Sequence, residues 1–143
     1  MRTFTYIIAC AAVSLAAIAA PRAASAQEFK VVVNSGNSVE SMTADEASKI
    51  FLKTSVKFSN GTAAVPVDQK GPARAAFTKA VHGRAVSAVD TYWQQQVFSG
   101  KDMPPVSKAT DDDVIAFVKG NPGGVGYVSA GAATAGVKVV AIK

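Results

Sequence analysis

Continuous apolar runs and helix-period stripes alternate along most of the chain. The valine-rich run at 29–34 predicts a strand buried on both faces, because a strand with one solvated face would alternate polar and apolar residues. Further strands are predicted at 63–68, 124–129 and 137–142. Pro66 has no amide hydrogen to donate to a sheet ladder, so we expect it at an edge or at a strand end.

One helix is predicted between the first two strands, and a second helix just after them. Residues 43–53 begin with Thr43 and have Glu46 three positions later, which is the spacing of a capping box. The next helix opens at Gly71–Pro72, because proline is favoured in the first helical turn, and ends at Gly83. Its predicted inner face consists of Ala73, Ala76, Phe77, Ala80 and Val81.

Two more helices precede the last strands. The third covers residues 87–98, with Ser87 as its cap and with Val97 among its inner residues. The fourth begins at Thr110, and the three aspartates that follow suit the positive end of the helix dipole better than a metal site. The order β-α-β-α-α-α-β-β predicts one α/β domain with a mixed β-sheet flanked by helices.

The first 26 residues have the character of a secretory signal peptide. Arg2 precedes an apolar run, and the tripeptide at 24–26 fits the A-x-A pattern of a cleavage site. We therefore expect residues 1–26 to be cleaved and residues 27–143 to form the exported domain. Two alternatives stay open, an uncleaved membrane anchor and a lipidated Cys10.

Charge and cysteine content narrow the function. Loss of Arg2 and Arg22 with the signal would lower the formal charge from +5 to +3, without clustered cations, which argues against a nucleic-acid surface. Cys10 is the one cysteine, so the mature domain would contain no disulfide and no cysteine metal ligand. The single histidine, His82, falls at a predicted helix end, where a role at the helix dipole is more common than catalysis. We expect neither an enzyme nor a cofactor.

The segment VPVDQKGPARAAF at 65–77 combines a short strand, a glycine-proline turn and the start of a helix. Free amides and the dipole at a helix N-terminus favour an anion. Gly71, Ala73 and Arg74 would supply amides, and Lys70 and Arg74 would add two positive charges. The alternative is a plain connecting turn whose cations are solvated.

Several motifs resemble, in order, the phosphate-type periplasmic substrate-binding proteins of ABC transporters. KVVVNSGNSVESMTADEASKIFLKTSVKFSNG is similar to a strand, helix and turn of that family, and VPVDQKGPARAAFTKAV falls where the family has a strand, a Ser-Gly-Thr anion loop and a helix. YWQQQVFSGKDMPP, DDDVIAFVKGNPGGVGYV and the last strand also resemble it. The resemblance spans nearly all of 29–143 and implies a type 2 periplasmic-binding fold, of which this length allows about one lobe.

The chain departs from the family pattern at the anion loop itself. Lys70, Gly71 and Pro72 stand where the family has Ser-Gly-Thr, so only amides and two cations remain to hold an anion. Lys53 and Phe58 also replace a glycine and a tryptophan of the family pattern. The resemblance therefore implies the fold, whereas tight phosphate binding does not carry over in the same way.

Together these features predict an exported solute-binding protein that binds phosphate or a similar oxyanion for an ABC transporter or an envelope sensor. The expected ligand-binding residues are Lys70, Gly71, Ala73 and Arg74, with Ser35 and Asn37 from the loop after the first strand. The alternative is a single-lobe interaction or scaffold module of the cell envelope without a small-molecule site. In a variant of it, two copies form a homodimer whose lobes face each other across the anion site.

Overall fold

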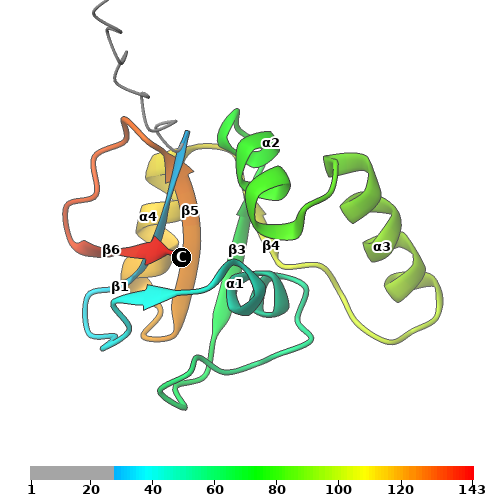
Figure 1. Ribbon diagram of the computed structural model, residues 1–143, viewed down its shortest axis with the longest axis horizontal. Helices are drawn as coiled ribbons and strands as arrows, with labels where there is room; N and C mark the ends of the chain where they lie inside the picture. The colour runs from blue at the N-terminus through cyan, green and yellow to red at the C-terminus, as the bar shows by residue number, and fades with distance from the viewer. Residues whose placement is uncertain (1–27) are drawn as a thin grey trace, which may run out of the picture.

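The structure, a computed structural model, describes residues 28–143; the expected signal peptide and Cys10 lie outside the described residues. A six-stranded sheet forms its centre, in the order β2-β6-β1-β5-β3-β4 (Figure 1). The strands are β1 (Phe29–Asn34), β2 (Ser41–Met42), β3 (Val65–Gln69), β4 (Val106–Lys108), β5 (Gly124–Ser129) and β6 (Val137–Ile142). The predicted α/β class with a mixed sheet flanked by helices is confirmed.

Strand direction decides which loops meet at each end of the sheet. β1 runs antiparallel to its neighbours β5 and β6, whereas β3 runs parallel to β5 and β4. Val33 of β1 and Pro66 of β3 both pair with Val125, while Phe29 pairs with Ser129. The end of β1 therefore lies beside the start of β3. The end of β3 lies at the opposite end of the strands.

Helices cover both faces of this sheet. They are α1 (Ala44–Phe51), α2 (Ala73–Phe77), which continues into a π-helical turn η1 (Thr78–His82), α3 (Val86–Phe98) and α4 (Asp111–Gly120). α1 and α2 lie over one face and α4 over the other, while α3 extends away from the body (Figure 1). Within residues 28–143, no helix combines the length and the apolar character needed to cross a bilayer.

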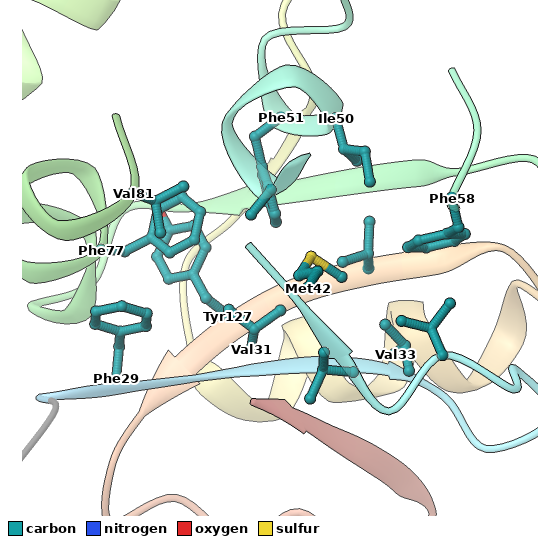
Figure 2. Packing of buried hydrophobic residues seen from close by; sticks show 14 of the residues in the cluster. Phe29, Val31, Val33, Met42, Ile50, Phe51, Phe58, Phe77, Val81 and Tyr127 are labelled. Atoms are coloured by element: carbon teal, nitrogen blue, oxygen red, sulfur yellow. The ribbon is translucent and has the colours of Figure 1, made fainter. Parts of the chain in front are cut away.

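The valine run of β1 is buried on both faces, as predicted. Val31 and Val33 belong to the cluster beneath α1 and α2, and Val32 belongs to the cluster beneath α4. Figure 2 shows the first cluster, in which aromatic rings from β1, α1, α2 and β5 meet. Phe51 and Phe77 pack edge to face with ring centroids 4.7 Å apart.

Two of the predicted helix caps are confirmed. Thr43 Oγ1 accepts a hydrogen bond from the Glu46 amide (3.1 Å), and the Glu46 carboxylate accepts one from the Thr43 amide (2.8 Å). Thr110 Oγ1 likewise accepts from the Asp113 amide (3.2 Å), at the start of α4. Each bond satisfies an amide that the first helical turn leaves without an intrahelical partner.

The Ser87 cap was a wrong prediction. α3 begins at Val86 with Ala85 as its N-cap, and no side chain caps it. Gly83, which has φ 63°, ends η1 as predicted, and only two residues separate it from α3. Because α3 starts so soon after this turn, Ser87 already lies inside the first helical turn, where its hydroxyl cannot take the capping position.

Two residues predicted to face inward are exposed instead. Ala80 lies in η1, where the wider turn places Thr78 and Val81 in the core and rotates Ala80 toward solvent. Val97 lies near the end of α3, beyond Val89 and Trp93, which are the buried residues of that helix. A helix that projects from the body can bury only its first turns, so the stripe predicted from its apolar positions ends before Val97.

Candidate functional site

An open groove of about 530 Å³ runs along β4, between the strands and the projecting helix α3. Its polar side is formed by the end of β3 and the first turn of α2, which contribute Asp68, Lys70 and Arg74. Its apolar side is formed by α3 and by the segment before β4, which contribute Trp93, Val97, Phe98, Pro104 and Pro105. An apolar groove with a few converging charges is the usual form of a ligand-binding site.

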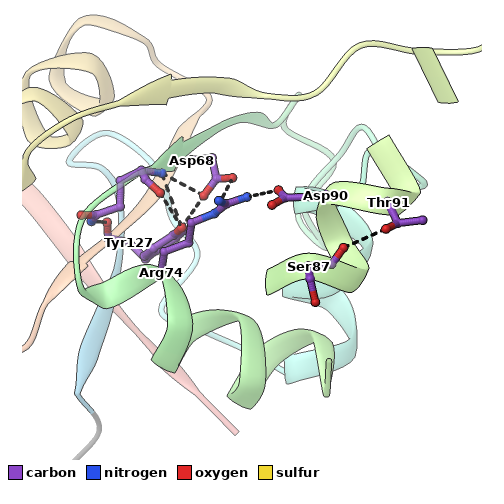
Figure 3. Close-up of polar contacts among 7 residues, drawn as sticks. Asp68, Arg74, Ser87, Asp90, Thr91 and Tyr127 are labelled. Atoms are coloured by element: carbon purple, nitrogen blue, oxygen red, sulfur yellow. Dashed lines mark hydrogen bonds and ion pairs between the residues drawn. The ribbon is translucent and has the colours of Figure 1, made fainter. Parts of the chain in front are cut away.

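Arg74 connects the two sides of the groove. Its Nη2 donates to Asp90 Oδ1 of α3 at 2.5 Å, and its Nε lies 3.7 Å from Asp68 Oδ2 of β3 (Figure 3). The hydroxyl of Tyr127 donates a short hydrogen bond to Asp68, which also accepts from the Gln69 amide (2.8 Å). A guanidinium therefore lies between two carboxylates, one of them fixed by the core of the protein.

Burial and charge together set the protonation of this network. Burial raises the pKa of Tyr127, and the negative charge of Asp68 with its hydrogen bond raises it further. For Arg74, burial alone would lower the pKa, but the hydrogen bond to Asp90 and the charges of Asp68 and Asp90 outweigh burial and raise it. Tyr127 thus stays a neutral donor and Arg74 stays a cation at any physiological pH.

The structure brings together four of the six predicted site residues, but not in the arrangement expected from the sequence. Lys70 lies exposed at the groove, and its amide donates to the Lys108 carbonyl of β4 (2.9 Å). The Arg74 amide donates to Gly71 (3.1 Å). Of the three amides expected to hold the anion at this turn, those of Gly71 and Ala73 have no hydrogen-bond partner within residues 28–143.

The side chain of Arg74 faces Asp68 and Asp90, on the groove side of the turn, rather than an anion placed over the helix start. The N-cap position is occupied by Pro72, without a side-chain hydrogen bond, and α2 continues for five residues before the π-helical turn. Gly71 has a local structural reason, because a Cβ there would meet Gln69 Oε1 at 2.5 Å. The turn is consequently shaped by packing as well as by any ligand.

Ser35 and Asn37 do not lie near this groove. They follow β1, which is antiparallel to β5, whereas Lys70 and Arg74 follow β3, which is parallel to β5. The two pairs of residues therefore lie at opposite ends of the strands. Asn37 is buried, and its Oδ1 accepts hydrogen bonds from the Val39 amide (3.0 Å) and from Asn60 (3.1 Å). This loop is therefore tied to the turn around Asn60, and the two halves of the expected site are separate.

Sequence reasoning missed Asp68, Asp90 and Tyr127 as parts of the site. Asp68 could have been suspected, because a carboxylate near the end of a buried strand and just before a helix commonly faces a crevice. Asp90 gives no such signal, since it reaches Arg74 only through the placement of α3. Tyr127 lies in β5 between two buried residues, Gly126 and Val128. A buried tyrosine usually needs a hydrogen-bond partner for its hydroxyl.

His82 lies close to this network, at the end of η1. Its Nδ1 is 2.8 Å from Ser48 Oγ of α1, and its ring packs edge to face on Phe77. Burial lowers the pKa of His82 to about 4, against the opposing effect of the Asp68 charge, and Arg84 lowers it further. At neutral pH the ring is uncharged, so it does not supply the positive charge expected at a helix end.

Comparisons with known proteins find solved structures of similar fold. A putative phosphate ABC transporter substrate-binding protein with bound phosphate from Clostridium perfringens matches with a TM-score of 0.62 and 16% identity, over 80% of this chain and 44% of that one. A possible phosphate binding protein from Planctomyces limnophilus matches with a TM-score of 0.59 and 18% identity, over 81% and 41%.

An ABC-type phosphate transport receptor from Vibrio cholerae matches with a TM-score of 0.55 and 15% identity, over 80% of this chain and 46% of that one. No protein-family model and no curated protein matches the sequence. At such low identity the likeness is one of fold, and the chain spans less than half the length of these proteins. The chain thus has the mixed α/β fold of a part of phosphate-type substrate-binding proteins.

Proposed function

We propose that the chain is an exported, periplasmic single-lobe binding module. It binds phosphate or a similar oxyanion at the guanidinium of Arg74, on the side that contacts Asp90. In this proposal it delivers or reports the anion to an ABC permease or an envelope sensor. The expected signal peptide supports export. The likeness in fold to proteins described as phosphate-binding supports the class of ligand.

The contact between Arg74 and Asp90 is the observation that carries the proposal. A guanidinium binds carboxylate and phosphate oxygens with the same N–H donors, so a carboxylate on Arg74 marks a place where an oxyanion fits. Asp90 is on the projecting helix and its side chain is 49% exposed, so water and solutes reach this contact. Asp90 occupies the position that an external oxyanion would take.

The balance of charge determines how well the anion binds. With Asp90 in place, the carboxylates of Asp68 and Asp90 match the cations Lys70 and Arg74. If the anion displaces Asp90 from Arg74, two cations face it and only Asp68 opposes it. Binding therefore has to compete with an existing ion pair, and we expect weak affinity that falls as salt is added.

Calorimetric titration of the purified protein with inorganic phosphate tests the proposal. Arg74→Lys should weaken or abolish the heat of binding, because lysine keeps the charge but loses the forked donor geometry. Arg84→Lys is the matched control, since Arg84 is exposed and lies outside the groove. Absence of binding by the unaltered protein at millimolar phosphate and sulfate would refute the oxyanion proposal.

A second candidate is the interaction module without a small-molecule site. The observation that favours it is the apolar side of the groove, where Val97 and Phe98 are exposed. A carrier of phosphate alone has no use for such a surface, whereas a protein partner does. Recovery of one stable protein partner from envelope extracts, lost on Phe98→Ser and independent of phosphate, would favour this candidate over the first.

A further inference from the structure

The large apolar side chains that residues 28–143 leave exposed gather on one part of the surface. We name this part the apolar face: Val56, Val65, Val97, Phe98 and Val106 line two hollows that share Pro104 and Pro105, and Met103 directly precedes Pro104 in the chain. Of the exposed large apolar residues in this part of the chain, Val139 alone lies elsewhere, on β6. A contiguous apolar surface of this kind is typical of an interface with another protein.

The apolar face has both a projection and hollows that could receive it. Phe98, at the end of α3, is 97% exposed and stands beside the groove along β4. A second hollow of about 380 Å³, lined by Val56, Val65 and Val106, lies on the other side of Pro104 and Pro105. Pro104 and Pro105 line both hollows, so the projecting Phe98 and the two hollows belong to one continuous surface.

Charges on the apolar face balance one another. Lys53 lies 3.6 Å from Asp102 at its border, and Arg74 contacts Asp68 and Asp90 within the groove. With Lys70, the face has three cations and three carboxylates, although the full sequence has a formal charge of +5. A partner of strong positive or negative charge therefore gains little here, whereas a surface of mixed, equal charge is complementary.

We propose that the apolar face docks a second copy of this chain around a two-fold axis, with Phe98 of each copy inserted into the groove of the other. A two-fold interface must be complementary to itself, and this face meets that condition in shape and in charge. In the dimer, Phe98 lies against Trp93 and the two prolines of the opposite groove. The aromatic side chain supplies the buried centre that stable interfaces commonly have.

Dimer formation also completes the groove. In one copy the groove is open to solvent, and the side chain of Asp90 is half exposed. The opposite Phe98 covers part of this opening and narrows the path to the ion pair. Dimerisation does not depend on oxyanion binding, because the apolar face and its charge balance are present without any ligand.

Sedimentation equilibrium of the purified protein in phosphate-free buffer provides the test. We expect a dimer at about 100 µM, a concentration at which even a micromolar dissociation constant gives mostly dimer. Phe98→Ser should weaken dimerisation at least about tenfold, as expected for an aromatic residue at the centre of an interface. Val139→Ser is the matched control, because it removes an exposed apolar side chain outside the apolar face and should leave the dimer intact.

Circular dichroism of each variant establishes that it is folded before its mass is compared. Because Phe98 is almost fully exposed in one copy, its replacement should leave the folded state unchanged. A monomer at the highest concentration, a dimer that withstands Phe98→Ser, or equal weakening by Val139→Ser would each overturn the proposal. So would a monomer that instead captures an unrelated protein through the apolar face.

Discussion

Phe77 and Tyr127 stack face to face, with ring centroids 3.9 Å apart and planes inclined by 5°. Phe77 comes from α2 and Tyr127 from β5. The stack therefore joins the helix that carries Arg74 to the tyrosine whose hydroxyl donates a hydrogen bond to Asp68. This aromatic contact connects the core to the charged network of the groove. A change in the core here is expected to reach the charged network.

The stack leads to a prediction about stability. Phe77→Ala should lower the free energy of unfolding by about 3–5 kcal/mol, because it removes a buried ring and leaves a cavity beneath α2. Urea denaturation measures the change. Val139→Ala is the control, since it removes an exposed apolar side chain that lies outside both the core cluster and the apolar face, and the change there should stay below about 1 kcal/mol. Similar losses for both variants would contradict the described packing.

Thr43 and Ser87 both lie near a helix start, but their replacement should change the free energy of unfolding by different amounts. Thr43→Ala removes the hydrogen bond to the Glu46 amide and should lower the free energy of unfolding by about 1 kcal/mol. Ser87→Ala should cost less than about 0.5 kcal/mol, because Ser87 caps no helix. Thermal unfolding of both variants gives the comparison, and a larger loss at Ser87 would show that α3 begins two residues later than described.

His82 predicts how stability depends on pH. Burial lowers the pKa of His82 in the folded protein from 6.5 to about 4. The unfolded chain therefore binds a proton more readily, and stability decreases as the pH falls from about 6.5 to about 4, after which this contribution levels off. The loss should be about 2 kcal/mol, allowing for the exposed part of the ring.

Urea denaturation at several pH values, with His82→Gln for comparison, isolates this contribution. Glutamine keeps a polar partner for Ser48 but does not titrate, so the difference in stability between the two proteins should shrink between pH 6.5 and 4. Carboxylates titrate in both proteins and cancel in the difference. Parallel pH profiles would mean that His82 is as hydrated in the folded protein as in the unfolded one.

Asp90 should limit the binding of oxyanions, if Arg74 is their site. Asp90→Asn removes the competing carboxylate and should tighten phosphate binding about two- to fivefold, the range that an exposed ion pair can account for. Asp112→Asn changes the net charge equally at an exposed position on α4 and serves as the control. If both substitutions strengthen binding to the same degree, the effect comes from net charge and Arg74 is not the site.

Local sequence signals predicted most of the fold. The valine run of β1 and the capping box at Thr43 depend on neighbours along the chain, so pattern alone identifies them. The two short strands β2 and β4 were missed, because two or three residues give no periodicity and their pairing depends on strands far along the sequence. The π-helical turn η1 was missed for a related reason, since its wider turn has no distinct pattern and is fixed by packing.

The site was harder to predict than the fold. Lys70, Gly71, Ala73 and Arg74 were grouped because they are consecutive or nearly so, and neighbours along the chain stay close in any fold. Ser35 and Asn37 were joined to them without knowledge of strand direction, which places them at the other end of the sheet. The Asp90 contact with Arg74 depends on where a projecting helix points, and no local pattern encodes that direction.

The antiparallel course of β1 leaves Ser35 and the groove at opposite ends of the sheet. A chemical handle attached at the exposed Ser35 would therefore fix the protein to a sensor chip or a bead with its groove facing the solution. Oriented immobilisation of this kind would let soluble anions and incoming proteins be compared on the same sample.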